Sequence, residues 1–534
     1  MERQPSERVD ALTGIFEAAF TALVGFVITA APVMLHLISP PIAILFSFGS
    51  ASLVAIYLER AAPTIILISY LFQTMFVAMA SPQVTVFSDL DPMKAYNFIS
   101  TVAIWLTLAI RLALGRIRLS PFVWRLLMAS SGVLALAGVF FIAGLAIDAR
   151  GAAIYMRNLG LPILLFQVCL VIACRTPLTM REAVSALLAA LVFCGYFELF
   201  ALDWWLTLTN GWTYWTLASV VSHDPHEAER VARETGQVAV GVTDFLMSSL
   251  FNTNLLGDLK IMVVRLQGPN FHPISFGYAL AILTAFVAVQ GRVLLPLAAA
   301  PLLLIVGAKG ALVLLVFSLL FSLIARFYTG FLLPLGLGLT LTAYAAFAFY
   351  SGLASGDFHV LGLIGGVNGF LANPIGHTLG QGGNFSTNFA AIDWSKYQHM
   401  GAADVAVESA IGVLLFQMGV AGFVVIAIYL WMARTAWRLF KLWRAPALAF
   451  SASAIAIILV NGLFQEEALY APLALGLVLS LTGLTFGALD LRTNVVRDRD
   501  APGLEPQRRS TRFERKYPTR LRTPAPPFGP RPIG

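Results

Sequence analysis

The chain has 534 residues, of which 58% are hydrophobic and only 12% are charged, and its mean hydropathy is +0.80. This composition excludes an ordinary soluble globular protein and predicts an all-α, polytopic integral membrane protein. The formal net charge is +7. From Asp490 to the end, however, eleven Lys and Arg stand against five Asp and Glu, so one tail carries nearly all of the excess. We therefore expect the lipid bilayer, and no nucleic acid, as a partner.

Apolar segments of about 20 residues, the length that crosses a hydrocarbon core of about 30 Å, recur along the chain. They predict about 14 transmembrane helices, near residues 14–38, 40–58, 62–80, 97–114, 127–147, 155–174, 183–201, 272–291, 294–308, 310–327, 330–350, 408–432, 446–464 and 468–488. Residues 1–13 are polar and lack the pattern of a removable signal peptide. Residues 489–534, rich in proline and arginine, predict a disordered basic tail.

Basic residues follow every second predicted helix, and short cytoplasmic loops of membrane proteins are enriched in Lys and Arg. We therefore expect both termini in the cytoplasm. The residues are Arg60, Arg116, Arg118, Arg125, Arg175, Arg181, Arg292, Arg434, Arg438, Lys441 and Arg444. Because successive crossings alternate between the two sides of the membrane, the chain divides into five parts. These are an N-terminal bundle (14–201), a periplasmic loop (202–271), central helices (272–350), a periplasmic glycine-rich loop (351–407) and C-terminal helices (408–488).

Residue types that hold metals are sparse. In the first long loop, His223, His226 and Glu227 lack a further ligand at a supporting position, so a solvated amphipathic helix is the favoured interpretation there. The three cysteines lie in apolar runs and indicate packing rather than a disulfide or a metal site: Cys169, Cys174 and Cys194. We expect neither a metal nor a cofactor.

Two basic residues stand close to the expected periplasmic face. Arg265 begins the turn Arg-Leu-Gln-Gly-Pro-Asn-Phe-His-Pro, and its guanidinium could hold a phosphate group through two hydrogen bonds. Lys309 lies in Gly-Ala-Lys-Gly, where a hairpin would divide an apolar run that is too long for one crossing. The simpler alternatives are an interfacial anchor for Arg265 and a loop residue that reaches the interface for Lys309.

Glu408 begins the predicted helix that follows the second long loop and is a candidate functional residue. The simpler alternative is a helix-start carboxylate, because the helix dipole favours an acidic residue in the first turn. His377 lies in Gly376-His-Thr-Leu-Gly-Gln-Gly-Gly. Glycine-rich loops bring backbone amides close to phosphate, but no strand precedes this one, so it does not match a nucleotide-binding fingerprint. Glu466 and Glu467 are reserve candidates for a base, and their adjacency favours a solvated turn.

Four segments occur in a familiar order: Arg265-x-x-Gly-x-x-x-x-Pro, the Lys309-Gly hairpin, Pro374-x-Gly-x-x-x-Gly, and Glu408-Ser-x9-Gly-x-x-Gly. Over about residues 260–435 the chain resembles the O-antigen polymerase and O-antigen ligase superfamily of bacterial envelope enzymes. The resemblance implies a metal-independent, inverting glycosyltransferase of the inner membrane. Its donor would be an oligosaccharide linked to undecaprenyl diphosphate, with the reaction on the periplasmic face.

The resemblance also implies roles for the candidate residues. Arg265 and Lys309 would bind the diphosphate, although Lys309 stands where arginine is common. Glu408 and His377 would be catalytic, and Glu408 stands where ligases of the family tend to carry histidine. For His377, binding the acceptor or shaping its pocket is the alternative role.

This substitution favours a polymerase of repeat units of an exopolysaccharide, capsule or O-antigen, with a chain-length regulator and a flippase as pathway partners. The alternatives are a ligase that transfers glycan to lipid A-core or another acceptor, and a non-catalytic flippase of lipid-linked glycan.

Overall fold

The computed structural model describes residues 5–218, 246–249, 261–386, 389 and 394–499. Met1–Leu491 forms one compact unit and Arg492–Gly534 a second. The first half is helical: α1 (Pro5–His36), α2 (Pro40–Tyr57), α3 (Ala62–Ala80), α4 (Tyr96–Ala113), α5 (Pro121–Leu145), α6 (Ala149–Ala173), α7 (Met180–Phe200), α8 (Leu202–Leu208) and α9 (Gly211–Ala218). Short 3-10 turns, η1 (Ser81–Gln83), η2 (Phe87–Leu90) and η3 (Met93–Ala95), join α3 to α4.

A two-stranded antiparallel sheet, β1 (Met247–Ser249) and β2 (Met262–Val264), pairs Met247 with Val264. A 3-10 turn, η5 (Gly268–Asn270), follows it. The remaining helices are α12 (Pro273–Val289), α13 (Leu294–Val306), α14 (Lys309–Phe327), α15 (Leu332–Ser355), α16 (Phe358–Ala372), α17 (Trp394–Met400), α18 (Ala410–Met418), α19 (Val420–Trp443), α20 (Pro446–Asn461), α21 (Glu467–Tyr470) and α22 (Leu477–Arg499), the last preceded by a π-helical turn, η7 (Pro472–Gly476).

Eleven helices in the described part are long and apolar enough to cross a membrane, which agrees with an all-α polytopic membrane protein. Three further predicted spans correspond to the shorter apolar helices α12, α13 and α20. The total of fourteen crossings and the orientation in the membrane stay predictions. Proline in the first turn starts α2, α3, α12 and α20 close to their predicted boundaries, because proline fixes a helical φ where no N–H donor is needed. Helix α5 also begins at a proline, Pro121, but earlier than the predicted start at residue 127.

The core of the first unit lies around α6, α12 and the start of α22. Of the apolar window of α6, and of the window that begins at Pro472, 89% is buried, whereas for α15 only 6% is buried. α12 packs against α7, α13, α14 and α20. Helix α15 therefore presents nearly all of its apolar surface outward, as expected of a helix that faces lipid.

The predicted span 408–432 is wrong as one helix. The chain instead forms α18 and α19, which are separated at Gly419 (φ 56°, ψ −134°). A Cβ atom at Gly419 would lie 2.0 Å from the carbonyl oxygen of Pro374, so only glycine allows this break. Ser409 is the N-cap of α18, and its side chain accepts a hydrogen bond from Gly412 N. Glu408 thus lies before the cap and outside the first helical turn.

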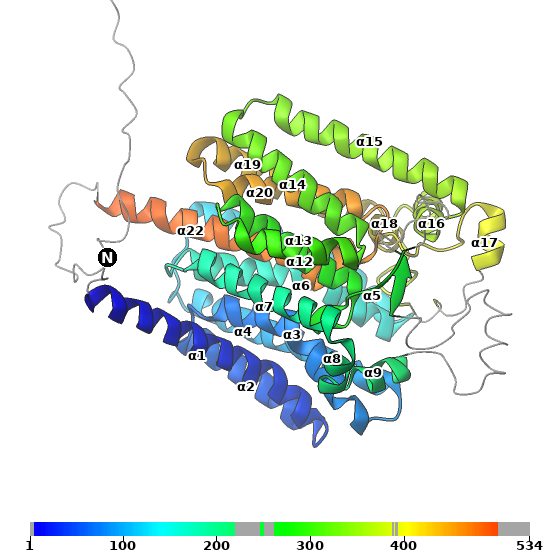
Figure 1. Cartoon of the computed structure of the whole chain (residues 1–534). Helices are drawn as coiled ribbons and strands as arrows, with labels where there is room; N and C mark the ends of the chain where they lie inside the picture. Colours follow the sequence, from blue (N-terminus) through cyan, green and yellow to red (C-terminus); the bar gives the residue numbers. More distant parts are fainter. Residues whose placement is uncertain (1–4, 219–245, 250–260, 387–388, 390–393, 500–534) are drawn as a thin grey trace, which may run out of the picture. The chain divides into compact units, whose positions relative to one another are not determined.

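The segment 351–407, predicted as a glycine-rich loop, contains α16 and α17. At 1.5 Å per residue, α16 and α18 measure only about 22 Å and 13 Å, too short for a hydrocarbon core of about 30 Å. In Figure 1 both are seen almost end-on, whereas the long bundle helices run across the picture. They lie at the same end of the bundle as α8, α9 and the strands, opposite the start of α1.

Candidate functional site

The link between α20 and α21 joins segments that are distant in sequence. Asn461 donates a hydrogen bond from Nδ2 to the carbonyl oxygen of Gly310 (2.7 Å), at the start of α14. The hydroxyl of Tyr278, on α12, donates to Oε1 of Gln465 (2.6 Å). A Cβ atom at Gly310 would lie 2.3 Å from Gln465 Oε1. The absence of a side chain at Gly310 therefore allows the first turn of α14 to pack closely against this link.

Glu466, in the same link, is only 1% exposed, so its interpretation as part of a solvated turn is wrong. It accepts hydrogen bonds from the hydroxyl of Tyr155 (2.5 Å) and from the backbone N–H of Asn384 (3.0 Å). Burial raises the pKa of the Glu466 carboxyl to about 8, against the lowering effect of these two hydrogen bonds. A Cβ atom at Gly383 would collide with the Tyr155 hydroxyl, which explains a glycine beside this pair.

Asn384 connects Glu466 to Glu408. While its N–H bonds to Glu466, its side-chain Oδ1 accepts from the backbone N–H of Glu408 (3.0 Å). Glu408 has φ 58°, a left-handed conformation that is costly for a residue other than glycine and that clusters at functional sites. His359, on α16, holds the other side of this residue through a 3.2 Å contact between Nδ1 and the backbone oxygen of Glu408.

The carboxylate of Glu408 is partly shielded from solvent. His359 Nδ1 lies 3.5 Å from its Oε2. Burial is the largest cause that raises the pKa of Glu408, His359 opposes the shift and the nearby Glu467 adds to it. A carboxylate with a raised pKa is a better proton acceptor than a free one. His359 was not a candidate from the sequence, because a single histidine in a segment predicted as a loop carries no spacing signal.

The turn that carries Arg265 is held by a buried acid. Glu198, on α7, is 1% exposed and accepts hydrogen bonds from the backbone N–H groups of Gln267 (3.0 and 3.2 Å) and Gly268 (2.7 Å). Arg265 itself extends the sheet, since its N–H donates to the carbonyl of Leu246 (2.7 Å). Glu198 was also missed, although an acidic residue in an apolar run is a usable signal.

The Arg265 side chain lies near the carboxylates. Burial lowers the pKa of its guanidinium, and the electrostatic interaction with Glu467 raises it. Glu467 also interacts electrostatically with Glu408 and Glu466. The structure thus brings the predicted residues Arg265 and Glu408 into one electrostatic neighbourhood around Glu467.

Lys309 and His377 are placed differently. Lys309 is the first residue of α14 and is exposed, next to the Gly310 carbonyl that Asn461 holds. The ring of His377 stacks on Phe416 (centroids 4.1 Å apart), and its Nδ1 lies 3.1 Å from the Phe416 carbonyl oxygen. Phe416 follows Glu408 by eight residues, or about 12 Å of helix. His377 therefore belongs to the far end of α18 rather than to the surroundings of Glu408.

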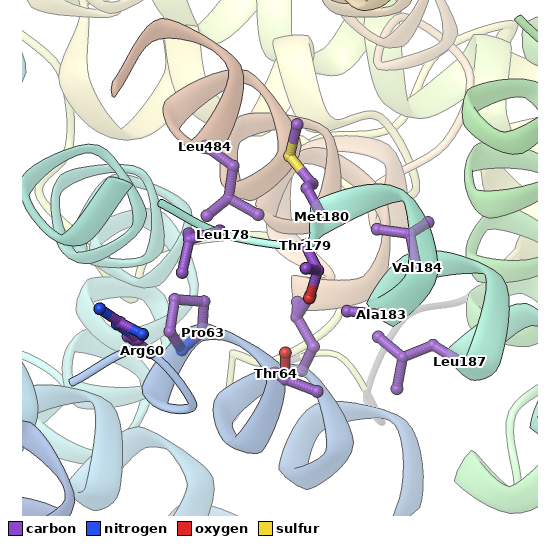
Figure 2. Close-up of a pocket in the computed structure, with 11 residues that line it drawn as sticks. Arg60, Pro63, Thr64, Leu178, Thr179, Met180, Ala183, Val184, Leu187 and Leu484 are labelled. Carbon is purple, nitrogen blue, oxygen red and sulfur yellow. The ribbon is translucent and has the colours of Figure 1, made fainter. Parts of the chain in front are cut away.

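Two hollows in the described part lie elsewhere. Figure 2 shows one of about 50 Å³, lined by Arg60, Thr64, Thr179 and apolar side chains that include Leu484. The other, of about 180 Å³, lies between α4, α5 and α6 and is mostly apolar. Neither is lined by a carboxylate. Proton-transfer chemistry therefore points to the Glu408 and Glu466 region rather than to these hollows.

Within residues 5–218, 246–249, 261–386, 389 and 394–499, no group of three or more His, Cys, Asp or Glu could hold a metal ion. The weaker candidates His223, His226 and Glu227 lie outside the described residues. The three cysteines are buried, in agreement with a packing role. No protein-family model matches the chain, and no curated protein or solved structure matches it.

Proposed function

We propose that this protein is a bacterial inner-membrane glycosyltransferase. In this proposal it polymerises oligosaccharide repeat units linked to undecaprenyl diphosphate, on the periplasmic face, for an exopolysaccharide, capsule or O-antigen. The observation that supports it is the meeting of four distant segments at the link between α20 and α21: Glu408 through Asn384, the start of α14 through Asn461, the Arg265 turn through Glu467, and the glycine-rich loop through Glu466. These are the segments in which the resemblance to O-antigen polymerases and ligases lies.

In the proposed reaction, a hydroxyl oxygen of the acceptor glycan attacks C1 of the donor sugar. The bond between C1 and the diphosphate oxygen breaks, and undecaprenyl diphosphate leaves with the bonding electron pair. Glu408 takes the hydroxyl proton, for which its raised pKa suits it. Arg265 and Lys309 offset the negative charge that develops on the leaving diphosphate.

His377 has a separate role in this proposal. Because its Nδ1 faces a carbonyl oxygen, which only accepts hydrogen bonds, Nδ1 carries the proton and Nε2 is left as an acceptor. About 12 Å of helix separates its stacking partner Phe416 from Glu408. We therefore assign His377 to binding the acceptor glycan, with its Nε2 as a hydrogen-bond acceptor, rather than to the proton transfer at Glu408.

The analysis of lipid-linked intermediates in a deletion strain tests the function. Loss of a polymerase leaves single repeat units on the lipid in the periplasmic leaflet. Loss of a ligase leaves lipid-linked polymer there, and loss of a flippase leaves single repeat units in the cytoplasmic leaflet. Unchanged lipid-linked intermediates and unchanged surface polysaccharide would reject all three functions.

A further inference from the structure

Arg157 is a charged residue on α6, a helix whose apolar window is 89% buried. Its guanidinium is half-buried, and Nε donates to Oδ1 of the neighbouring Asn158 (3.1 Å). In the part of the chain that the structure describes, no carboxylate lies within ion-pair distance of Arg157. An ionisable residue inside a membrane helix is costly, and it marks a substrate or ion pathway by default.

Lys94 and Arg157 interact electrostatically, and Asp91, the ion-pair partner of Lys94, also acts on Arg157. Its Nζ stands 4.2 Å from the centre of the Phe87 ring and 5.8 Å from that of Tyr214. The Tyr214 ring in turn packs against Phe271 (5.2 Å) in the turn that follows Arg265. Lys94 is thus linked to the Arg265 turn through the rings of Tyr214 and Phe271.

The charges of Arg265 and Lys94 both act on the ring of His272. Its Nδ1 accepts a hydrogen bond from the backbone N–H of Ser275 (3.3 Å), which can only donate, so the proton of the neutral ring is on Nε2. Burial, together with smaller contributions from the positive charges of Arg265 and Lys94, lowers the pKa of His272 to about 4. His272 is therefore a neutral N–H donor in a positive field at neutral pH.

Two of the cations here, Arg157 and Arg265, form no ion pair among the described residues, although Glu198 is buried under the Arg265 turn. Asp91 is shared by Lys94 (3.1 Å) and the exposed Arg150 (3.1 Å), and Glu467 is the acidic side chain that influences Arg265. The Nε of Arg265 is buried and has no hydrogen-bond partner. Such donors, in partly dehydrated surroundings, are suited to an anion with several acceptor oxygens.

We propose that Arg157, Lys94 and Arg265 line one anion-binding site that takes a diphosphate group, with His272 as a neutral donor. The choice of a lipid-linked diphosphate as the ligand rests on the proposed function. In that case Arg157 supplies the planar, two-pronged donor that Lys309 cannot provide. The donor lipid would then be held between the N-terminal helices and the turn before α12.

Binding to the purified full-length protein in detergent tests this site. The probes are farnesyl diphosphate, inorganic pyrophosphate and farnesol, and phosphatidylglycerol micelles serve as a competitor. We expect Arg157→Gln and Lys94→Gln each to weaken farnesyl diphosphate binding at least tenfold, a factor that corresponds to about 1.4 kcal/mol. Arg125→Gln is the matched control, because Arg125 is exposed at the other end of the bundle, and it should bind as wild type. Farnesol should not bind at this site.

The outcomes separate the site from the function. Wild-type affinity in both Gln variants, or displacement by phosphatidylglycerol as effective as by pyrophosphate, would overturn the proposal even if the deletion strain shows a polymerase defect. Binding that depends on Arg157, in a protein whose deletion leaves polysaccharide unchanged, would keep the site and reject the function. If Arg157→Gln does not fold, Lys94→Gln and the charge-retaining Arg157→Lys decide. Arg157→Lys should then keep binding within tenfold of wild type.

Discussion

At the scale of single residues, the chain keeps two carboxylates almost fully buried. Glu198 and Glu466 are each 1% exposed, and neither has a cation within ion-pair distance in the described part of the chain. Each accepts hydrogen bonds from backbone N–H groups instead. Burying a carboxylate is expensive unless hydrogen bonds compensate. Glu198 thereby holds the turn that carries Arg265, and Glu466 holds the segment that carries Asn384.

Replacing Glu408 by Gln tests the proposed base. The amide keeps the shape and removes the proton acceptor, so polymer synthesis should fall by about 100-fold or more, with unchanged protein abundance in the membrane. The measurement is polysaccharide yield and chain length in a complemented deletion strain. Glu182→Gln, at an exposed side chain, should retain full activity. Near-normal chain length in Glu408→Gln would remove Glu408 from the mechanism.

Lys309 gives a second comparison at this scale. Lys309→Ala removes a charge proposed to contact the diphosphate and should reduce polymer yield by about tenfold, since a charge-assisted hydrogen bond contributes about 1.5–3 kcal/mol. Lys309→Arg keeps the charge and should remain active. Equal yields from both variants, measured in the same complemented strain, would mean that the charge of Lys309 is not used.

The raised pKa of Glu466 predicts a pH dependence of stability. Its ordinary value is 4.5 and its value in the folded protein is about 8, so between these values the folded state binds more protons than the unfolded state. Stability from this group is therefore fully present below about pH 4.5 and is lost as the pH rises through about 8. The Tm of the wild type in detergent should fall over this window more steeply than that of Glu466→Gln. Parallel curves would show that Glu466 does not titrate there.

At the scale of elements, hydropathy located the long helices well and failed where glycine decides the backbone. The run 408–432 is apolar throughout, and only the left-handed Gly419 divides it into α18 and α19. The glycines of α16 made its sequence resemble a loop. In the structure they allow close helix packing: a Cβ atom at Gly366 would lie 2.5 Å from the Cα of Gly412 on α18. Small residues of this kind are common where membrane helices touch.

Gly366→Ala should therefore separate α16 from α18. Overpacking of this type costs about 1–3 kcal/mol, so we expect a lower Tm and weaker activity, because α16 carries His359 beside Glu408. Gly336→Ala on α15 is the control, since no atom lies within 4 Å of a Cβ atom there. Alanine should leave its Tm unchanged or raise it, as it favours the helix. Equal Tm values for the two variants would contradict the packing account.

The site itself was only partly predictable. Arg265 and Glu408 stand out because charges are rare in this sequence. Tyr155 and Asn384 do not, because their roles arise from contacts across the fold. Tyr155 meets Glu466 from 311 positions away, and no local spacing encodes that pairing. Arg157 was hidden inside an apolar helix whose neighbours only the fold supplies.

At the scale of the whole molecule, the two ends of the bundle differ in charge chemistry. At one end, Glu59 forms ion pairs with Arg111 (3.0 Å) and Arg175 (3.2 Å), which joins the C-terminal ends of α2, α4 and α6. These segments were predicted to share the cytoplasmic side. The acidic residues around Glu467 lie near the start of α14, at the opposite end of the bundle from Glu59. The proposed function requires that other end to face the periplasm.

Cysteine labelling tests this orientation. Asp404→Cys, at an exposed residue near Glu408, should react with a membrane-impermeant maleimide in intact spheroplasts. Arg116→Cys, also exposed, should react only after the membrane is permeabilised. The parent protein should remain unlabelled because its three cysteines are buried. The reverse pattern would place Glu408 in the cytoplasm and exclude periplasmic glycosyl transfer.

Asn384 has a final consequence for how such a protein would work. Its N–H is fixed by Glu466 and its side chain fixes the backbone of Glu408, so the two acidic segments cannot relax independently. Any ligand that displaces this asparagine changes the energetics of both, and by thermodynamic reciprocity protonation at either carboxylate changes the affinity for that ligand. Binding of such a ligand and proton uptake by Glu408 or Glu466 would then be linked through Asn384 in the glycine-rich loop.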